Sequence, residues 1–212
     1  MSDITLVIGS KQFSSWSLRA WLFLRHHGVA FREVLVPLYV VDPPDTRARI
    51  LRYSPSGKVP FLNVDGLQVW ESLAICEFAA EHFGLADAWP ADSAARAFAR
   101  AIATEMHAGF AELRKALPFE AKRRPAPIVM SEAVETDVAR IRTIWREARS
   151  RFGASGPWLF GEFGIADAMF APVAVRFHLY AVTLDDPEAA YVQTVLSHPA
   201  LQQWLAEAAS ES

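Results

Sequence analysis

One segment of the chain combines a proline and backbone groups in a way that could bind a small peptide. It reads Ser-Pro-Ser-Gly-Lys-Val-Pro-Phe-Leu and places Lys58, Val59 and Pro60 at the head of a predicted strand. Proline cannot donate to a strand ladder, so Pro60 marks an edge, a strand start or a cis bond. If the Val59–Pro60 bond is cis, we expect the Val59 N–H and C=O to face outward, where an extended ligand could pair with them.

A second segment, about a dozen residues after Pro60, could bind an anion. Glu71 and Ser72 stand at the start of an apolar helix, where unpaired N–H groups and the helix dipole favour negative charge. The Ser72 hydroxyl could add a hydrogen bond. The two segments together predict a peptide-like ligand with a free α-carboxylate. The alternative interpretation is an edge-strand proline and an ordinary capping pair, and capping and ligand binding can coexist.

Composition excludes several classes of protein. Hydrophobic residues make up 52% of the 212-residue chain and charged residues 21%, which is typical of a globular protein. The net charge is -3 and no long run of Lys or Arg occurs, so we expect no nucleic-acid partner. A single cysteine, Cys76, excludes an intramolecular disulfide and fits a reducing compartment. No segment resembles a signal peptide or a membrane span, so we expect a cytoplasmic protein with no membrane partner.

The first 84 residues alternate between strand and helix patterns. Asp65-Gly66 between two apolar runs predicts a type I′ hairpin. We expect a mixed sheet with helices on both faces and a right-handed crossover between the first two strands. The predicted strands are residues 4–8, 31–36, 59–64 and 67–70, and the predicted helices are residues 18–24, about 45–52, and 72–83.

After Gly84 the pattern becomes entirely helical. Residues 85–92 read as a linker. The sequence therefore predicts an α/β domain over residues 1–84 and an all-α domain over residues 91–212. The predicted helices of the second domain are residues 91–117, 131–152, 165–182, 187–196 and 199–208.

Along essentially its whole length, the chain resembles the cytosolic glutathione S-transferases. Their thioredoxin-like N-terminal domain and all-helical C-terminal domain are the fold that this resemblance implies. The Phe13-Ser-Ser-Trp-Ser-Leu-Arg19 segment is similar to the Ser-Ser-Cys-Ser-x-Arg signature of the serine-type zeta class. The other segments that carry the resemblance are Ser54–Leu62, Glu71–Glu77 and Phe163–Asp167.

The resemblance implies glutathione as a co-substrate and gives roles to the residues of the site. Ser14 would donate a hydrogen bond to the glutathione sulfur, and Ser15 is the alternative donor. A thiol with a pKa of ~8.5 must lose its proton to become a nucleophile. Lowering that pKa by about two units needs roughly 2.7 kcal/mol, which one hydroxyl and a helix N-terminus can supply. From the residues alone, Ser14, Ser15 and Ser17 could equally be helix caps.

The glutathione itself would lie along the two segments described above. Val59 and Pro60 would receive the cysteinyl backbone, and Glu71 and Ser72 the γ-glutamyl end. Lys58 could reach the glycine carboxylate, although a solvated lysine is the alternative.

The electrophile pocket has fewer signals. Trp16 replaces the cysteine of the zeta-like signature, and His107, Phe110 and Arg176 could reach the same pocket from the helical domain. Packing in the core or at the surface is the alternative for each. Arg176 stands on an apolar helix, where a buried cation needs an anionic partner or substrate. A departure from the family pattern is Gly164, where the relatives carry a capping Ser or Thr three residues before Asp167.

We therefore expect a glutathione transferase that conjugates the thiolate to a small electrophile. One alternative is a glutathione-dependent cis–trans isomerase resembling maleylacetoacetate isomerase, which the Trp16 replacement makes less secure. Another is a non-catalytic carrier or regulator. The family resemblance also implies a homodimer and a detoxifying role. No metal is expected, because His26 and His27 lack further ligands nearby in sequence.

Overall fold

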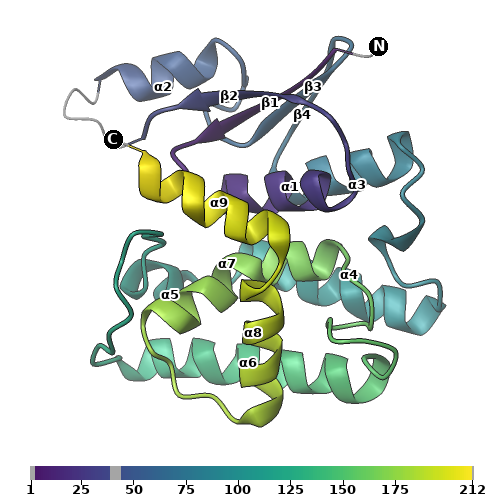
Figure 1. Cartoon of the computed structure of the whole chain (residues 1–212), viewed down its shortest axis with the longest axis vertical. Coiled ribbons are helices and arrows are strands. Elements are labelled where there is room, and N and C mark those ends of the chain that lie inside the picture. The colour runs from purple at the N-terminus through teal and green to yellow at the C-terminus, as the bar shows by residue number, and fades with distance from the viewer. Residues whose placement is uncertain (1–2, 39–43, 212) are drawn as a thin grey trace.

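A four-stranded sheet forms the core of the N-terminal half (Figure 1). This computed structural model describes residues 3–38 and 44–211, so the outer limits of the two predicted domains, residues 1 and 212, lie outside it. The strand order is β2-β1-β3-β4, with β1 and β2 parallel and the other pairs antiparallel. The strands are β1 (Ile4–Gly9), β2 (Arg32–Val36), β3 (Phe61–Val64) and β4 (Leu67–Trp70).

Helices cover both faces of this sheet (Figure 1). Helices α1 (Ser15–His26) and α3 (Ser72–His82) lie between the sheet and the helical half, and α2 (Pro44–Leu51) lies on the opposite face. The β3–β4 turn has positive φ at both central residues, 51° at Asp65 and 90° at Gly66. Two left-handed residues are what a type I′ turn requires, so the hairpin prediction is confirmed. The α/β fold predicted for this half is also confirmed.

The second half is helical, as predicted. Apart from two isolated β-bridges between residues 158 and 162, the described residues after β4 form no strand pairing. The elements are η1 (Ala86–Ala88), α4 (Ser93–Ala108), α5 (Ala111–Ala116), α6 (Glu132–Phe152), α7 (Ile165–Leu179), α8 (Asp186–Leu196) and α9 (Pro199–Ser210).

The prediction of one long helix over residues 91–117 is wrong, because two helices, α4 and α5, occupy this segment. Helix α4 ends at Ala108, and Phe110 adopts a left-handed conformation with φ 59°, which no continuous α-helix contains. The N–H of Leu113 in the new helix donates to the Asp137 carboxylate of α6 at 2.9 Å. Gly109, which the prediction passed over, ends α4, and the contact with α6 stabilises the start of the second helix.

Helix α7 is the centre of the molecule and contacts α1, α4 and α8. Asp167 in its first turn accepts hydrogen bonds from the N–H groups of Leu159 and Gly164, each at 3.1 Å, and from the Tyr191 hydroxyl at 3.0 Å. A Cβ on Gly164 would approach the backbone oxygen of Ala88 to 3.0 Å. The departure from Ser or Thr at this position therefore accommodates the close approach of η1.

Within the described ranges, no helix has both the length and the apolar character that a membrane span needs.

A histidine pair joins the two halves of the molecule. His26 Nδ1 in α1 lies 2.8 Å from His198 Nε2 at the start of α9. His198 Nδ1 accepts a hydrogen bond from the Ala200 N–H at 3.2 Å. In the neutral ring the proton is therefore on Nε2, which donates a hydrogen bond to His26 Nδ1. Burial and the neighbouring His26 lower the pKa of His198 to about 4. Burial also lowers the pKa of His26, although the carboxylates of Asp87 and Glu162 oppose this shift.

This pair predicts a loss of stability in mild acid. Folded His198 stays neutral down to about pH 4, whereas a histidine in the unfolded chain takes up a proton near its ordinary pKa of 6.5. The unfolded state therefore binds more protons between these values, and the free energy of unfolding falls as the pH falls through this range. We expect His198→Gln to flatten the dependence in urea denaturation series at several pH values. An unchanged slope in the variant would contradict the assignment.

Candidate functional site

A cavity of about 390 Å³ opens beside the N-terminus of α1. The start of α1, the loop before β3 and the start of α3 all contribute to its lining. Six residues singled out from the sequence line it, together with Phe13, Leu38, Ile50 and Gly57. Those six are Ser14, Trp16, Lys58, Val59, Pro60 and Glu71.

The loop before β3 offers backbone groups to this cavity. The Val59–Pro60 bond is cis. In the described part of the chain, no residue forms a hydrogen bond with the Val59 N–H or C=O. A peptide backbone lying along Val59 could therefore use both groups.

The start of α3 has the features of an anion site. Glu71 caps the helix with φ 70° and without a side-chain hydrogen bond to the helix N–H groups. A non-glycine residue at positive φ carries backbone strain, which concentrates at ligand sites. The Ser72 hydroxyl is buried and has no partner among the described residues. A buried hydroxyl without a hydrogen bond is costly, so Ser72 could accept a ligand group, although it is not among the residues that line the cavity.

Ser14 is the N-cap of α1, and its hydroxyl belongs to a short chain of hydrogen bonds. Its Oγ accepts the Ser17 N–H at 3.3 Å, and its O–H donates to Ser17 Oγ at 2.7 Å. Ser17 Oγ also accepts the Gly9 N–H at 3.1 Å. The sequence alone indicates Ser17 only as a possible cap. Ser17 follows Ser14 by three positions, and residues three apart are neighbours on a helix. This spacing could have indicated the hydrogen bond between the two serines.

Ser15 and Arg176 contact each other and are not among the residues that line the cavity. The Ser15 Oγ accepts a hydrogen bond from Arg176 Nη2 at 3.2 Å. The same guanidinium donates to the carbonyls of Leu117 at 2.8 Å and Pro172 at 3.4 Å. Backbone carbonyls and a hydroxyl are thus its partners, in place of the anionic group expected from the sequence. Of the two serines, only Ser14 faces the cavity.

Trp16 is surrounded by cationic and polar groups of both halves. His107 approaches the indole edge-on, with ring centroids 5.1 Å apart, and its Nε2 lies 3.5 Å from a Glu71 carboxylate oxygen. The guanidinium carbon of Arg19 lies 4.4 Å from the Trp16 ring centroid and that of Arg114 lies 5.5 Å from it. Burial and the nearby arginines outweigh Glu71 and lower the pKa of His107.

Arg19 is a residue of this region that sequence reasoning missed. It is fully buried, and its Nε and Nη1 have no hydrogen-bond partner among the described residues. Burial and the positive charges of Arg176 and Arg114 lower the pKa of Arg19 to about 9. Its position inside the apolar helix segment 18–24 was the available signal.

Phe110 and Cys76 belong to the core. Phe110 is 7% exposed and packs in the main hydrophobic cluster, outside the lining of the cavity. Burial raises the pKa of the Cys76 thiol, so this side chain stays protonated at neutral pH. Among the residues that the structure describes, no group of three or more His, Cys, Asp or Glu is placed to hold a metal ion.

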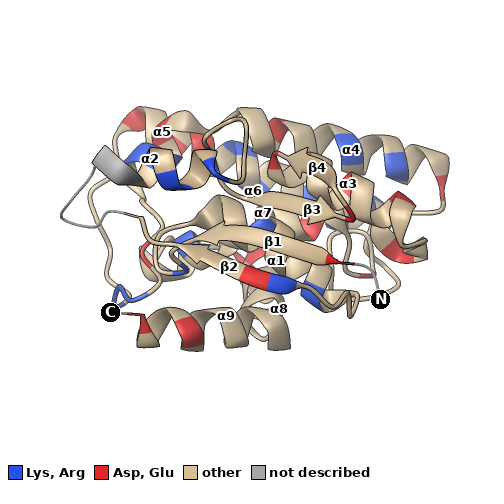
Figure 2. Ribbon diagram, turned by 90° about the horizontal axis from the view of Figure 1, so that it is seen from above, with Lys and Arg blue, Asp and Glu red and all other residues tan. Residues whose placement is uncertain are grey.

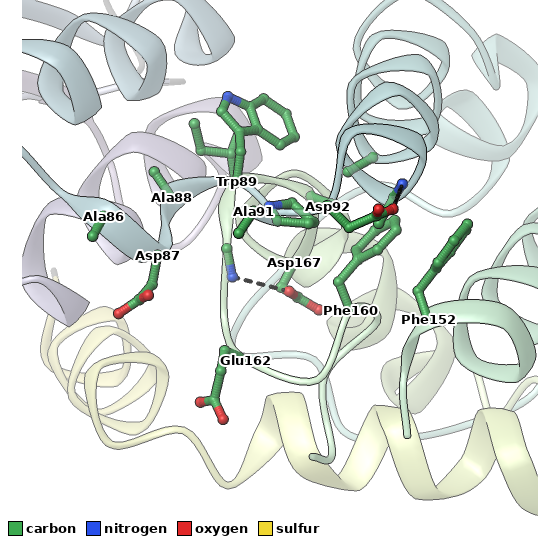
Figure 3. Close-up of a pocket in the computed structure, with 16 residues that line it drawn as sticks. Ala86, Asp87, Ala88, Trp89, Ala91, Asp92, Phe152, Phe160, Glu162 and Asp167 are labelled. Carbon is green, nitrogen blue, oxygen red and sulfur yellow. Dashed lines mark hydrogen bonds between the residues drawn. The ribbon is translucent and has the colours of Figure 1, made fainter. Parts of the chain in front are cut away.

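A second cavity, of about 360 Å³, lies between η1 and the start of α7 (Figure 3). Phe152 and Phe160 form one wall, and the carboxylates of Asp87 and Glu162 point away from these rings. Asp167 also lines it, but its carboxylate is already paired with backbone N–H groups. Among the described residues, the lining of this second cavity contains no serine hydroxyl, whereas Ser14 and the cis Val59–Pro60 bond line the first, so the first is the better candidate site.

The sheet-containing half, the helical half and the cavity at Ser14 were compared with known protein families. One family model, the glutathione S-transferase N-terminal domain, matches residues 13–82, and another, the glutathione S-transferase C-terminal domain, matches residues 131–207. The chain therefore belongs to the glutathione S-transferase family, whose enzyme class is glutathione transferase.

Solved structures share the whole fold. A glutathione transferase homologue from Burkholderia with bound glutathione is 22% identical, with a TM-score of 0.73 and coverage of 99% of this chain and 100% of that one. A Tau class enzyme from mango is 20% identical, with a TM-score of 0.70 and coverage of 98% and 97%. A theta class enzyme from Xanthomonas axonopodis with glutathione bound is 21% identical, with a TM-score of 0.67 and coverage of 97% and 98%. The search of curated proteins returned no match.

The two buried arginines predict opposite effects on stability. Arg19→Met removes a buried cation with unpaired N–H groups, so we expect the free energy of unfolding to rise by about 1 to 2 kcal/mol. Arg176→Met removes a guanidinium whose three nitrogens all have partners, and we expect a fall of about 1 to 3 kcal/mol. Urea denaturation of both variants measures the difference. Destabilisation by Arg19→Met would show that the cation is compensated.

Proposed function

We propose that the protein ionises glutathione at Ser14 and conjugates the thiolate to a small electrophile. The observation that carries this proposal is that Ser14, Val59, Pro60 and Glu71 line one cavity. A hydroxyl, free peptide groups and an anion site then lie within the reach of one tripeptide. The glutathione named in the Burkholderia and Xanthomonas structures supports this ligand class.

Each end of glutathione has a partner of suitable chemistry in this proposal. The cysteinyl backbone pairs with Val59, beside Pro60. The γ-glutamyl carboxylate binds the Ser72 hydroxyl and the N–H groups that begin α3, beside Glu71. The exposed Lys58 side chain takes the glycine carboxylate. Ser15 does not contact glutathione in this proposal, because its hydroxyl accepts a hydrogen bond from Arg176. It supports the site by fixing the first turn of α1.

The serine chain explains how the thiolate is stabilised. When sulfur arrives, the Ser14 O–H turns from Ser17 Oγ to the sulfur, and the Ser17 O–H turns to donate to Ser14 Oγ. Gly9 N–H stays on Ser17, so every group keeps a partner. The thiol proton leaves to solvent, and the sulfur lone pair forms the S–C bond. In a substitution the leaving group departs with its electron pair, and in an addition the substrate takes a proton from water.

The electrophile lies next to Trp16, with His107 at the edge of that ring. Phe110 and Arg176 shape this side of the site from behind. We further propose that the protein is a cytoplasmic homodimer with a detoxifying role and that the division at residues 1–84 and 91–212 separates glutathione binding from electrophile binding. Assays with a panel of electrophiles, maleylacetone included, separate conjugation from cis–trans isomerisation.

The Ser14→Ala variant tests the proposed chemistry. We expect the pKa of bound glutathione to rise by at least about one unit, because the sulfur loses its hydroxyl donor. The affinity for glutathione should change little, since Val59 and Ser72 are untouched. Titration of the thiolate absorbance measures this pKa. Identical curves for the variant and the wild type would reject Ser14 as the donor.

The Ser72→Ala variant tests the binding site separately. We expect glutathione to bind about tenfold more weakly or worse, because a hydrogen bond to a carboxylate is worth about 1.5 to 3 kcal/mol. The pKa of the thiol in the bound state should stay unchanged. Calorimetric titration measures the affinity, with Ser150→Ala, an exposed serine of α6, as the control. Equal affinities would place the carboxylate elsewhere.

A further inference from the structure

The loop that carries Ser14 is held by the far end of the chain. Residues 10–14 connect β1 to α1. Glu211, directly after α9, accepts the N–H of Lys11 at 2.8 Å on one carboxylate oxygen and that of Gln12 at 3.1 Å on the other. The Lys11 carbonyl accepts the Trp204 indole N–H at 3.0 Å, and the Gln12 carbonyl accepts the Ala121 N–H at 2.9 Å. All four backbone polar groups of these two residues are therefore paired with the helical half.

The Lys11 side chain strengthens the same connection. Its ammonium is buried and forms ion pairs with Glu33 of β2, at 2.6 Å, and with Glu207 of α9. The rings of Trp21 and Trp204 pack against each other next to it, with centroids 5.4 and 5.6 Å from the ammonium nitrogen. Figure 2 shows acidic residues at the C-terminal end of α9. One buried cation thus joins the sheet to the last helix.

The position of Ser14 depends on the conformation of this loop. The N–H groups of Phe13 and Ser14 both donate to the Ser10 carbonyl, at 3.0 and 2.8 Å. This compact turn begins on one side of Lys11 and Gln12 and ends at Ser14 on the other. A change in the path of Lys11 and Gln12 therefore moves the Ser14 hydroxyl directly. Hydrogen bonds weaken steeply with misalignment, so a small displacement would reduce its effect on a bound sulfur.

We propose that Glu211 is a positioning residue for the thiolate site, acting from the C-terminal end of α9 through the backbone of Lys11 and Gln12. This inference rests on the proposed function of Ser14. Apolar burial of Leu201, Trp204 and Ala208 already docks α9. The Glu211 carboxylate accepts hydrogen bonds from two consecutive N–H groups, so it also fixes the orientation of the Lys11–Gln12 backbone relative to α9. The C-terminal helix therefore sets the acidity of the bound thiol without touching glutathione.

The test compares Glu211→Ala and Glu211→Gln with two controls on the full chain. Glu132→Gln removes an exposed carboxylate from α6, and Ser210→Ala changes the neighbouring exposed residue of α9. Thiolate absorbance titration gives the pKa of bound glutathione. Binding of S-methylglutathione, which has no acidic thiol, reports affinity alone. Thermal unfolding shows that each variant is folded.

We expect Glu211→Ala to raise the pKa of bound glutathione by about one unit, which lowers the thiolate fraction near neutral pH by up to about tenfold. Glu211→Gln keeps one acceptor oxygen, so its shift should lie between those of the wild type and Glu211→Ala. The affinity for S-methylglutathione should stay within about twofold in all variants. Both controls should match the wild type.

Two results would overturn the inference. One is an unchanged thiol pKa in folded Glu211→Ala or, if that variant does not fold, in Glu211→Gln. The other is equal weakening of S-methylglutathione binding without a pKa shift, which indicates a purely structural role. If the wild type itself binds glutathione without lowering its thiol pKa, the proposed function fails and the inference fails with it. The wild-type titration thus distinguishes the two failures.

Discussion

The site depends on two helix N-termini that open into one cavity. The first turn of a helix leaves N–H groups without partners, and their partial positive charge favours anions. Helix α1 begins with the Ser14 hydroxyl on this cavity, and α3 begins with Glu71 and the unpaired Ser72 hydroxyl. In the proposed function, the first receives the thiolate and the second the carboxylate of the same ligand. The cis Val59–Pro60 segment lies between them in sequence and lines the same cavity.

The helical half keeps these helix starts in place. The buried helix α7 packs against both α1 and α3, and Arg176 on it holds the Ser15 hydroxyl at the first turn of α1. Helix α9 adds Glu207 and Glu211 at the loop before Ser14. In the proposed function, the N-terminal half therefore provides the groups that face glutathione, while the helical half provides the contacts that orient the Ser14 loop. Arg19 is buried beside Trp16, and two of its guanidinium nitrogens have no hydrogen-bond partner among the described residues, so a poorly compensated positive charge lies next to a residue that lines the cavity.

Local signals predicted much of this arrangement. Asp65-Gly66 specified its turn, and Gly84 follows the end of α3. The Val59–Pro60 segment and Glu71 line one cavity because they flank a short hairpin, whereas Ser72 is not in its lining. The break at Phe110 had a local signal that the prediction of one long helix overlooked, because Gly109 is the residue that ends α4. The contact of the new helix with Asp137 on α6 had no such signal. The contact between Glu211 and Lys11 joins residues 200 positions apart, and neither has a local pattern that indicates it. The hydrogen bonds from Arg176 to backbone carbonyls could likewise not be predicted from composition or from the spacing of apolar residues.

A crystal structure with glutathione bound tests the central claim most directly. We predict the sulfur within hydrogen-bond distance of Ser14 Oγ, with the Ser14 hydroxyl turned away from Ser17. The cysteinyl backbone should pair with Val59, and the γ-glutamyl carboxylate should contact Ser72 Oγ. Glutathione in the cavity beside Phe152 and Phe160, or a sulfur held by a group other than Ser14, would contradict the claim.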